Sequence, residues 1–133
     1  MSSPSKRLIA FFVLIGNIVP AYADPTMECS IKNESQVDTG ACLTDILKTV
    51  DTVLETSLSF AMDAANELDN STGRKVAAPA LKKAQAEWLQ YRDSHCDFVG
   101  STFGGGSGTG IAIQDCQIRH SRARSDELMK FTQ

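Results

Sequence analysis

Three segments of the chain carry apolar or small residues at steps of three and four, and this helical period most constrains what the chain can fold into. No segment of useful length shows the two-residue period of a strand. In the first segment the apolar face comprises Ile46, Val50, Val53, Leu54, Ser57, Ala61, Ala65 and Leu68. In the second it comprises Leu81, Ala84, Trp88, Tyr91 or Arg92, and His95. In the third it comprises Ile113, Cys116, His120, Ala123, Leu128 and Phe131.

The ends of these segments are marked by residues that break or start helices. Residues 70–73, Asn-Ser-Thr-Gly, predict the end of the first helix. Pro79 suits the first turn of the second helix, which we expect to end near Phe98. Residues 100–110 hold six glycines in eleven positions and predict a loop, and residues 24–38 are either loop or a short helix. The expected fold is all-α, a small antiparallel three-helix bundle.

The N-terminus has the parts of a cleavable secretory signal. Lys6 and Arg7 are followed by an apolar run and by Ala-Tyr-Ala directly before Asp24. We therefore expect residues 1–23 to be a signal peptide and residues 24–133 to be one exported domain. No later stretch is apolar enough to span a bilayer, so we expect a soluble periplasmic or secreted protein with no membrane partner after cleavage.

All four cysteines lie in the expected mature part, and an even number in a small exported domain indicates two disulfides. Three pairings are possible. We favour Cys29 with Cys42 and Cys96 with Cys116, because each pair brackets one local segment. The second bridge closes a loop of about 20 residues and would contribute roughly 3 kcal/mol of stability.

The charge of the chain is informative about partners. The net charge is −3 for the whole chain, and the mature part has 11 basic against 16 acidic residues, a net charge of −5. Nucleic acid is a poor partner for such a surface. A cationic protein is a better one, because opposite charges speed encounter.

The sequence carries no pattern that indicates catalysis. The G-x-x-x-x-G spacing from Gly105 to Gly110 is followed by Ile111, where a phosphate-binding loop needs Lys. The acidic residues are spread along the outer faces of the helices, and no nucleophile signature stands out. We expect a protein that is not an enzyme, with no catalytic residue and no cofactor.

Two histidines lie close in sequence to two of the cysteines, a pattern that fits either a zinc site or oxidised cysteines. His95 stands beside Cys96, and His120 follows Cys116 by four residues, so two sulfurs and two imidazoles come together if the helices are bridged here. Exported cysteines are more often oxidised than metal-bound. We therefore expect no metal ligands and partly buried histidines.

Residues 81–96 carry the most recognisable run of the chain. Leu-Lys-Lys-Ala-Gln-Ala-Glu-Trp-Leu-Gln-Tyr-Arg-Asp-Ser-His-Cys resembles the L-x-x-A-Q-x-x-W-x-x-Y-R-D-x-x-C core of the DUF1311 family, whose best-known members are the LprI-type lysozyme inhibitors. Residues 104–107 and 116–128 are similar to the family's glycine-serine loop and its C-terminal block. Two positions depart from its pattern: Ser121 stands where Thr is usual, and His120 where an apolar residue is usual.

This resemblance implies an exported periplasmic binding protein that inhibits lysozyme-type glycosidases, with a cationic lysozyme-like protein as partner. The alternative is a non-catalytic envelope interaction or stress protein with another periplasmic or cell-wall partner. The expected contact element is the loop of Gly104, Gly105, Gly106 and Ser107, which is narrow enough to enter a cleft with two carboxyl groups. A loop that only connects two helices is the other interpretation.

The remaining side chains of the motif have structural interpretations beside functional ones. Trp88 and Tyr91 are expected in the core. Arg92, Asp93 and Arg124 either form ion pairs that fix the register of two helices or point outward as a recognition patch.

Overall fold

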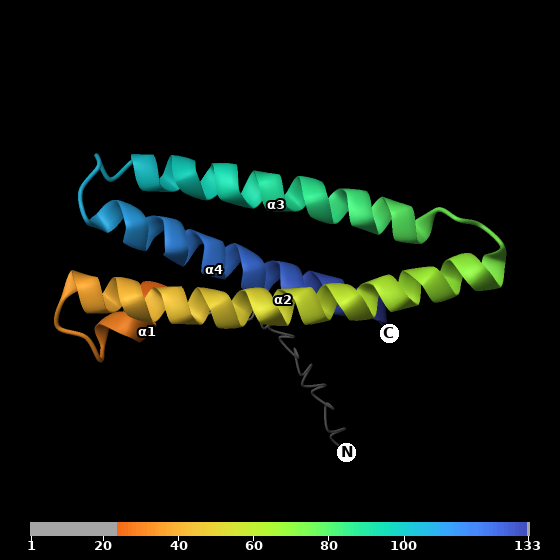
Figure 1. Cartoon of the computed structure of the whole chain (residues 1–133), viewed down its shortest axis with the longest axis horizontal. Helices are drawn as coiled ribbons and strands as arrows, with labels where there is room; N and C mark the ends of the chain where they lie inside the picture. Colours follow the sequence, from red (N-terminus) through yellow and green to blue (C-terminus); the bar gives the residue numbers. More distant parts are fainter. Residues whose placement is uncertain (1–23, 133) are drawn as a thin grey trace, which may run out of the picture.

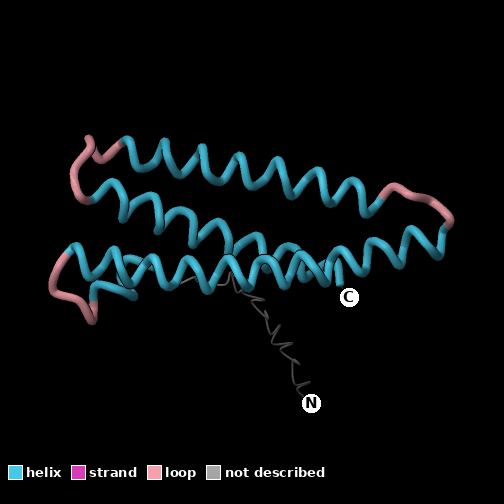
Figure 2. Tube along the Cα trace, viewed as in Figure 1, coloured by secondary structure: helices cyan, strands magenta, loops and turns pink. Residues whose placement is uncertain are grey.

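The computed structural model describes residues 24–132, and the expected signal peptide lies outside the described residues. The described chain is helical and contains no strand, so the all-α prediction is confirmed (Figure 2). Its elements are α1 (Pro25–Ser30), α2 (Gln36–Thr72), α3 (Ala77–Ser101), α4 (Gly108–Met129) and the 3₁₀ turn η1 (Lys130–Thr132). None of these helices is long and apolar enough to cross a membrane.

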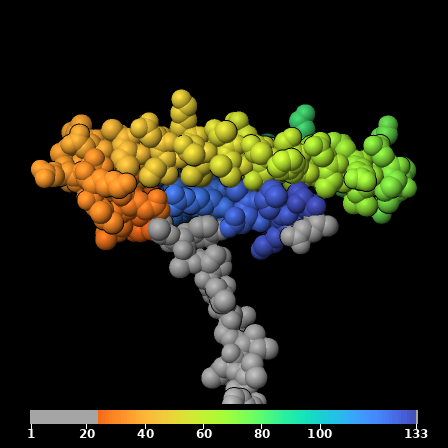
Figure 3. Space-filling view, turned by 90° about the horizontal axis from the view of Figure 1, so that it is seen from below, coloured from red at the N-terminus to blue at the C-terminus, as the bar shows by residue number. Residues whose placement is uncertain are grey.

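The three long helices form the antiparallel bundle that the sequence predicts, with α4 between α2 and α3 (Figure 1). The α3–α4 loop and the start of α2 lie at the same end of the bundle. The short helix α1 packs against α2 and α4, and seen from below it lies beside α4 along the N-terminal half of α2 (Figure 3). One end of the bundle is therefore built from α1, the start of α2, the end of α3 and the start of α4. The α2–α3 turn forms the other end, and the C-terminus lies short of it (Figure 1).

Helix α2 is longer than its apolar stripe predicts. It begins at Gln36, because the Ser35 hydroxyl accepts a hydrogen bond from the Asp38 backbone N–H at 3.1 Å and so caps the first turn. It ends after Thr72, where Gly73 adopts the left-handed conformation with φ 70°. The predicted stop at 70–73 is thus correct only at its last residue.

The core consists of two apolar clusters joined by polar contacts. Leu43 and Ile118 anchor the cluster nearer the loop end, and Leu54 and Leu128 anchor the other. The predicted stripes are wrong at Val53, Leu68, Ala84, Ala123 and Phe131, which are exposed. The interior positions of α3 and α4 are instead taken by the polar residues Gln85, Arg92, Asp115, Ser121 and Ser125.

Both predicted disulfides are confirmed. Cys29 is bonded to Cys42 and ties α1 to α2, and Cys96 is bonded to Cys116 and ties α3 to α4. Helix α1 is held further by an ion pair between Glu28 and Arg122, whose hydrogen bonds lower the pKa of Glu28 and raise that of Arg122. This short helix is therefore fixed by covalent and ionic contacts rather than by a large apolar face.

Asp69, in the last turn of α2, caps the start of α3. Its carboxylate accepts hydrogen bonds from the backbone N–H groups of Val76, Ala77 and Ala78 at 2.9–3.1 Å. These bonds, the one from Ala77 first, lower the pKa of Asp69 below its ordinary value of 3.8.

Asp69→Asn is expected to make the free energy of unfolding less dependent on pH in the acid range. A carboxyl group whose folded-state pKa is depressed stabilises the fold above its unfolded-state pKa, and this contribution is lost as the pH falls through the folded value. The parent should therefore lose more stability than the variant below about pH 3.8. Denaturant titrations at a series of pH values measure this, with exposed Asp63→Asn as the control. Parallel profiles for the parent and Asp69→Asn would contradict the assignment.

The glycine-rich segment is only partly a loop, so the predicted loop over residues 100–110 is corrected. Gly100 lies in α3, and Gly108 and Gly110 lie in α4, which leaves residues 102–107 as the connection. A Cβ at Gly100 would overlap the side chain of Ile113 and lie 3.3 Å from the Thr109 carbonyl oxygen. Gly100 thus allows α3 and α4 to approach closely just before the chain turns.

Gly100→Ala is expected to destabilise the fold by about 1–3 kcal/mol, because the added methyl group must push α4 away from α3. Gly40→Ala is the matched control, since Gly40 is also helical but has nothing within 4 Å of an added Cβ. That control should gain up to about 1 kcal/mol from helix propensity. Urea unfolding of both variants measures the difference. Equal effects would show that the close approach at Gly100 is not tight.

Candidate binding site

The α3–α4 loop projects from the end of the bundle and contains the residues that the sequence predicts as the contact element. Gly104, Gly105, Gly106 and Ser107 are all exposed. Gly104 and Gly105 have φ values of 69° and 84°, a conformation that residues with a Cβ rarely adopt. The turn therefore depends on these two glycines, whereas Gly106 has an ordinary negative φ and open space around it.

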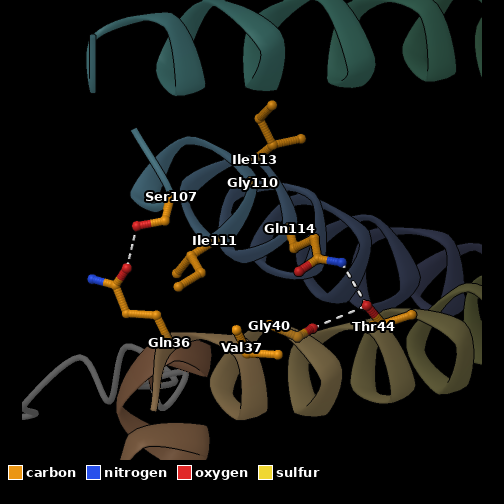
Figure 4. A pocket seen from close by; sticks show the side chains of 9 residues that line it. All are labelled: Gln36, Val37, Gly40, Thr44, Ser107, Gly110, Ile111, Ile113 and Gln114. Atoms are coloured by element: carbon orange, nitrogen blue, oxygen red, sulfur yellow. Dashed lines mark hydrogen bonds between the residues drawn. The ribbon is translucent and has the colours of Figure 1, made fainter. Parts of the chain in front are cut away.

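Ser107 connects this loop to the start of α2. Its hydroxyl donates a hydrogen bond to the side-chain oxygen of Gln36, as Figure 4 shows. About two turns further along α2, a second polar contact joins α4 to α2, since the Gln114 amide donates to the Thr44 hydroxyl at 2.7 Å. The loop is thus anchored on α2 as well as on its own two helices.

A groove of about 470 Å³ lies between these two contacts. Val37 and Gly40 of α2 form one wall, and Gly110 and Ile111 of α4 form the other, while Ile113 points toward α3 (Figure 4). The glycines contribute no side chain, so the groove is shallow and its lining is mostly apolar. It is suited to an apolar or neutral hydrogen-bonding group and not to an ion.

A second hollow of about 400 Å³ flanks the loop on the side of α1. It is lined by Val99 and Phe103 on the α3 side and by Asp115 and Arg119 on α4. Asp115 is engaged there, because it accepts hydrogen bonds from the Thr26 backbone N–H and hydroxyl at 3.1 and 3.0 Å. Its carboxylate therefore holds α1 in place and is not free for a ligand.

The loop itself is uncharged, and exposed apolar side chains lie in it and on the start of α2. No charged residue occurs between Asp97 and Asp115, a stretch that covers the end of α3, the loop and the start of α4. Phe103 in the loop and Val37 beside it are 57% and 82% exposed. Exposed apolar side chains grouped near a groove are typical of a protein contact surface.

Arg92 lies in the interior of the bundle. From the sequence alone it could either form an ion pair between helices or belong to an exposed recognition patch. Its side chain is only 10% exposed and donates to Asp51 of α2 at 3.0 Å and to Ser121 of α4 at 2.8 Å. Ser121 in turn donates to Asp51 at 3.1 Å. Asp93 accepts from the Arg92 Nε at 2.9 Å, so the two motif residues form one network across three helices.

Arg124 also packs within the bundle. Its side chain is 10% exposed and donates to Gln85 of α3 at 3.0 Å and to Glu127 at 2.7 Å. The guanidinium groups of Arg92 and Arg124 lie 5.6 and 5.9 Å from the centre of the Trp88 ring. These motif residues join the helices to one another, and none of them lines the groove or the second hollow beside the loop.

Of the two aromatic residues predicted to lie in the core, one is partly buried and the other is exposed. Trp88 is half-buried against the cluster of Leu54 and Leu128. The prediction for Tyr91 is wrong, because this side chain is 55% exposed. Neighbours on a helix point about 100° apart, and of this adjacent pair it is Arg92 that faces the core.

The two histidines lie together beside the Cys96–Cys116 disulfide. The rings of His95 and His120 are 5.1 Å apart, and Tyr91 stacks on His95 at 5.4 Å. Burial, together with the nearby His95 and two arginines, lowers the pKa of His120. This shift favours the neutral form of His120.

Sequence reasoning missed the contribution of α2 to this end of the molecule. Gln36, Val37 and Thr44 line the groove, but none of them belongs to the apolar stripe from which the helix was predicted. The sequence does contain a signal for them, since Ser35 followed by Asp38 three residues later is a helix-start pattern. An earlier start of α2 places these side chains opposite the glycine loop.

Comparison with known proteins agrees with the resemblance seen in the sequence. The family whose sequence model matches the chain is described as Lysozyme inhibitor LprI, and the match covers residues 27–128. A protein of Rhizobium meliloti (strain 1021), named only as uncharacterized, is 30% identical over 128 residues, with 92% of this chain and 91% of that protein covered. No solved structure matches the chain.

Proposed function

Because the chain belongs to the LprI lysozyme inhibitor family, we propose that its mature form is an exported periplasmic protein that binds and inhibits a lysozyme-type glycosidase through the α3–α4 loop. The proposed mature form spans residues 24–133, after removal of residues 1–23 as a signal peptide. Inhibition then results from occupation of the target's cleft and needs no catalytic residue. The family match carries the class of function, and the exposed, uncharged glycine loop carries the choice of contact element.

The shape of the loop supports this proposal. Lysozyme-type enzymes hold two carboxyl groups in a cleft that binds a sugar chain. Three consecutive glycines make the tip of the loop narrow, and its exposed backbone can hydrogen-bond in such a cleft. The Ser107 hydroxyl donates its proton to Gln36 and can still accept a hydrogen bond there. A tip without acidic side chains also avoids repulsion by the enzyme's carboxylates.

The way the loop is held supports it as well. A contact loop binds more tightly when its conformation exists before binding, because the cost of ordering is then already met. Here the loop lies between two helices tied by Cys96–Cys116, and Ser107 is bonded to Gln36. The two hollows beside the loop leave room for the rim of a cleft on either side.

The charge of the mature chain fits a cationic target. A net charge of −5 attracts a basic enzyme, although the tip itself is neutral. Attraction of this kind is screened by salt, so binding should weaken as ionic strength rises. Affinity measured by calorimetry at low and at physiological salt tests this point.

The direct experiment is a titration of lysozyme with the oxidised 24–133 protein. We expect the rate at which lysozyme lyses bacterial cell walls to fall as the protein is added, and to reach a floor at micromolar excess. An unchanged rate at that excess would refute the proposal for that enzyme type. Recovery of a non-lysozyme partner from periplasmic extract, without any lysozyme binding, would favour an envelope interaction protein instead.

A further inference from the structure

His95 of α3 and His120 of α4 are in contact across the interface of these two helices, next to the Cys96–Cys116 disulfide. In the proposed inhibition this disulfide only stabilises the fold and the loop. One ring nitrogen of each histidine and the Sγ of Cys116 all lie within 4.8 Å of one another. Both imidazoles are half-buried, so one side of the cluster is closed by protein and the other is open to water. This convergence of two nitrogens and a sulfur is a ligand set for a borderline metal ion.

The ring nitrogens of the two histidines are not used in hydrogen bonds to other residues of the described part of the chain. The ring of His95 stacks on Tyr91, and the ring of His120 meets Tyr91 edge-on. The resemblance to the family implies an apolar residue at position 120, and such a residue would pack in the same space without any polar atom. Among the described side chains only the Thr109 hydroxyl is buried without a partner, so water reaches the ring nitrogens of both histidines, and these nitrogens are open to an ion from the solvent.

We propose that His95 and His120 form a binding site for a divalent metal ion of the zinc type, which is strengthened when the Cys96–Cys116 disulfide is reduced. In the oxidised protein the two imidazoles are the protein ligands, and water fills the remaining positions. The sulfur of a disulfide has no thiolate charge and is not a useful ligand. In the reduced protein the Cys116 thiolate becomes the third protein ligand.

Reduction of the disulfide and binding of the metal ion are two separate steps. A dithiol reductant donates two electrons and two protons to the Cys96–Cys116 bond, becomes a disulfide itself and leaves two protein thiols. When the metal binds, the Cys116 thiol releases one proton and its sulfur coordinates the ion. Zinc bonds to nitrogen and sulfur are about 2.0–2.3 Å long, so atoms now within 4.8 Å need only side-chain rotation to close around one ion.

The composition of the chain makes this proposal straightforward to test. His95 and His120 are its two histidines, so an untagged protein has no other imidazole that binds metal. The probe is Zn²⁺ alone, measured by competition with a weak chelating dye, on the oxidised protein first. His120→Leu restores the residue type that the family pattern implies, and we expect it to weaken Zn²⁺ binding about tenfold or more. His95→Ala should do the same.

The second arm measures the effect of reduction. Cys29→Ser/Cys42→Ser removes the other disulfide, so that reduction of this variant exposes only Cys96 and Cys116. We expect reduction to tighten Zn²⁺ binding about tenfold or more, and Co²⁺ in place of Zn²⁺ to show a sulfur-to-cobalt charge-transfer band. If that variant does not fold, the wild-type protein reduced in full gives the same band, and His120→Leu should weaken it.

Each result of these titrations either supports or overturns one part of the metal-site proposal. Zn²⁺ affinity of the oxidised protein that is unchanged in both histidine variants would overturn the site. Reduced protein that binds no tighter, or lacks the cobalt–sulfur band, would overturn the role of Cys116. Loss of the metal site in His120→Leu with full inhibition of lysozyme would leave the inhibitor proposal standing, so the two proposals fail separately.

Discussion

Replacing Cys96 and Cys116 together by serine is expected to lower the free energy of unfolding by about 2–4 kcal/mol. The bridge closes a segment of 20 residues, and its removal returns conformational freedom to the unfolded chain. In the folded protein it ties the last third of α3 to the first half of α4, the two helices that the contact loop connects. For a domain of this size the loss is a large share of the total stability.

The same double variant should also weaken inhibition. Without the bridge the ends of α3 and α4 can separate, and the loop must then be ordered at the moment of binding. The measurements are urea unfolding followed by circular dichroism, and lysozyme titration under conditions where the variant is fully folded.

A control of matched stability separates the two effects. Leu128 is fully buried near the C-terminal end of α4, far along the bundle from the loop, and Leu128→Ala should cost about 2–5 kcal/mol. We expect this variant to inhibit like the parent once folded. A double serine variant that stays as stable as the parent and binds as tightly would place the contact on a helical face instead, such as that of Glu55 and Asp63.

Helical periodicity and cysteine spacing were sufficient to predict the overall architecture. The stripe through Val50, Leu54, Ser57 and Ala61 does face the core, and the local pairing of cysteines holds for both bridges. Both signals are local, because they depend on residues close in sequence. Such signals survive folding when the tertiary structure adds no competing demand.

The hydrophobic periodicity of the sequence did not predict which polar residues are buried. A method that counts apolar residues assigns Tyr91 and Ala84 to the inner face of α3, whereas Gln85 and Arg92 occupy it. Arg92 is tolerated in the interior because Asp51 and Ser121, from two other helices, satisfy its guanidinium group. Partners that lie 41 and 29 residues away in the chain leave no local signal.

Helix propensity likewise did not predict which residues of the glycine-rich segment are helical. Gly100, Gly108 and Gly110 are helical although glycine weakens a helix by about 1 kcal/mol at each position. At Gly100 the close approach of Ile113 explains the choice, because a larger residue would separate α3 from α4. Packing between helices, which the sequence does not display, thus overrides the local preference and shortens the loop to residues 102–107.

This shorter loop defines the sharpest test of the contact site. Gly106→Trp is expected to leave the fold intact, because Gly106 has a negative φ, is exposed and has nothing within 4 Å of an added Cβ. Gly104 and Gly105 are unsuitable, since their positive φ values would make any substitution distort the turn. An indole at the tip should exclude the loop from a narrow cleft and raise the inhibition constant about 30-fold or more, the size of a binding hot spot.

A bulky residue at the opposite end of the bundle serves as the control. Asn70 is exposed in the last turn of α2, so Asn70→Trp adds the same indole without approaching the loop. Gly106→Ala should give an intermediate loss of affinity, because one methyl group widens the tip only slightly. If Gly106→Trp inhibits as well as Asn70→Trp and the parent, the loop is only a connector between α3 and α4. The contact must then lie elsewhere, since no protein cleft that fits three glycines closely can also accept an indole at the same point.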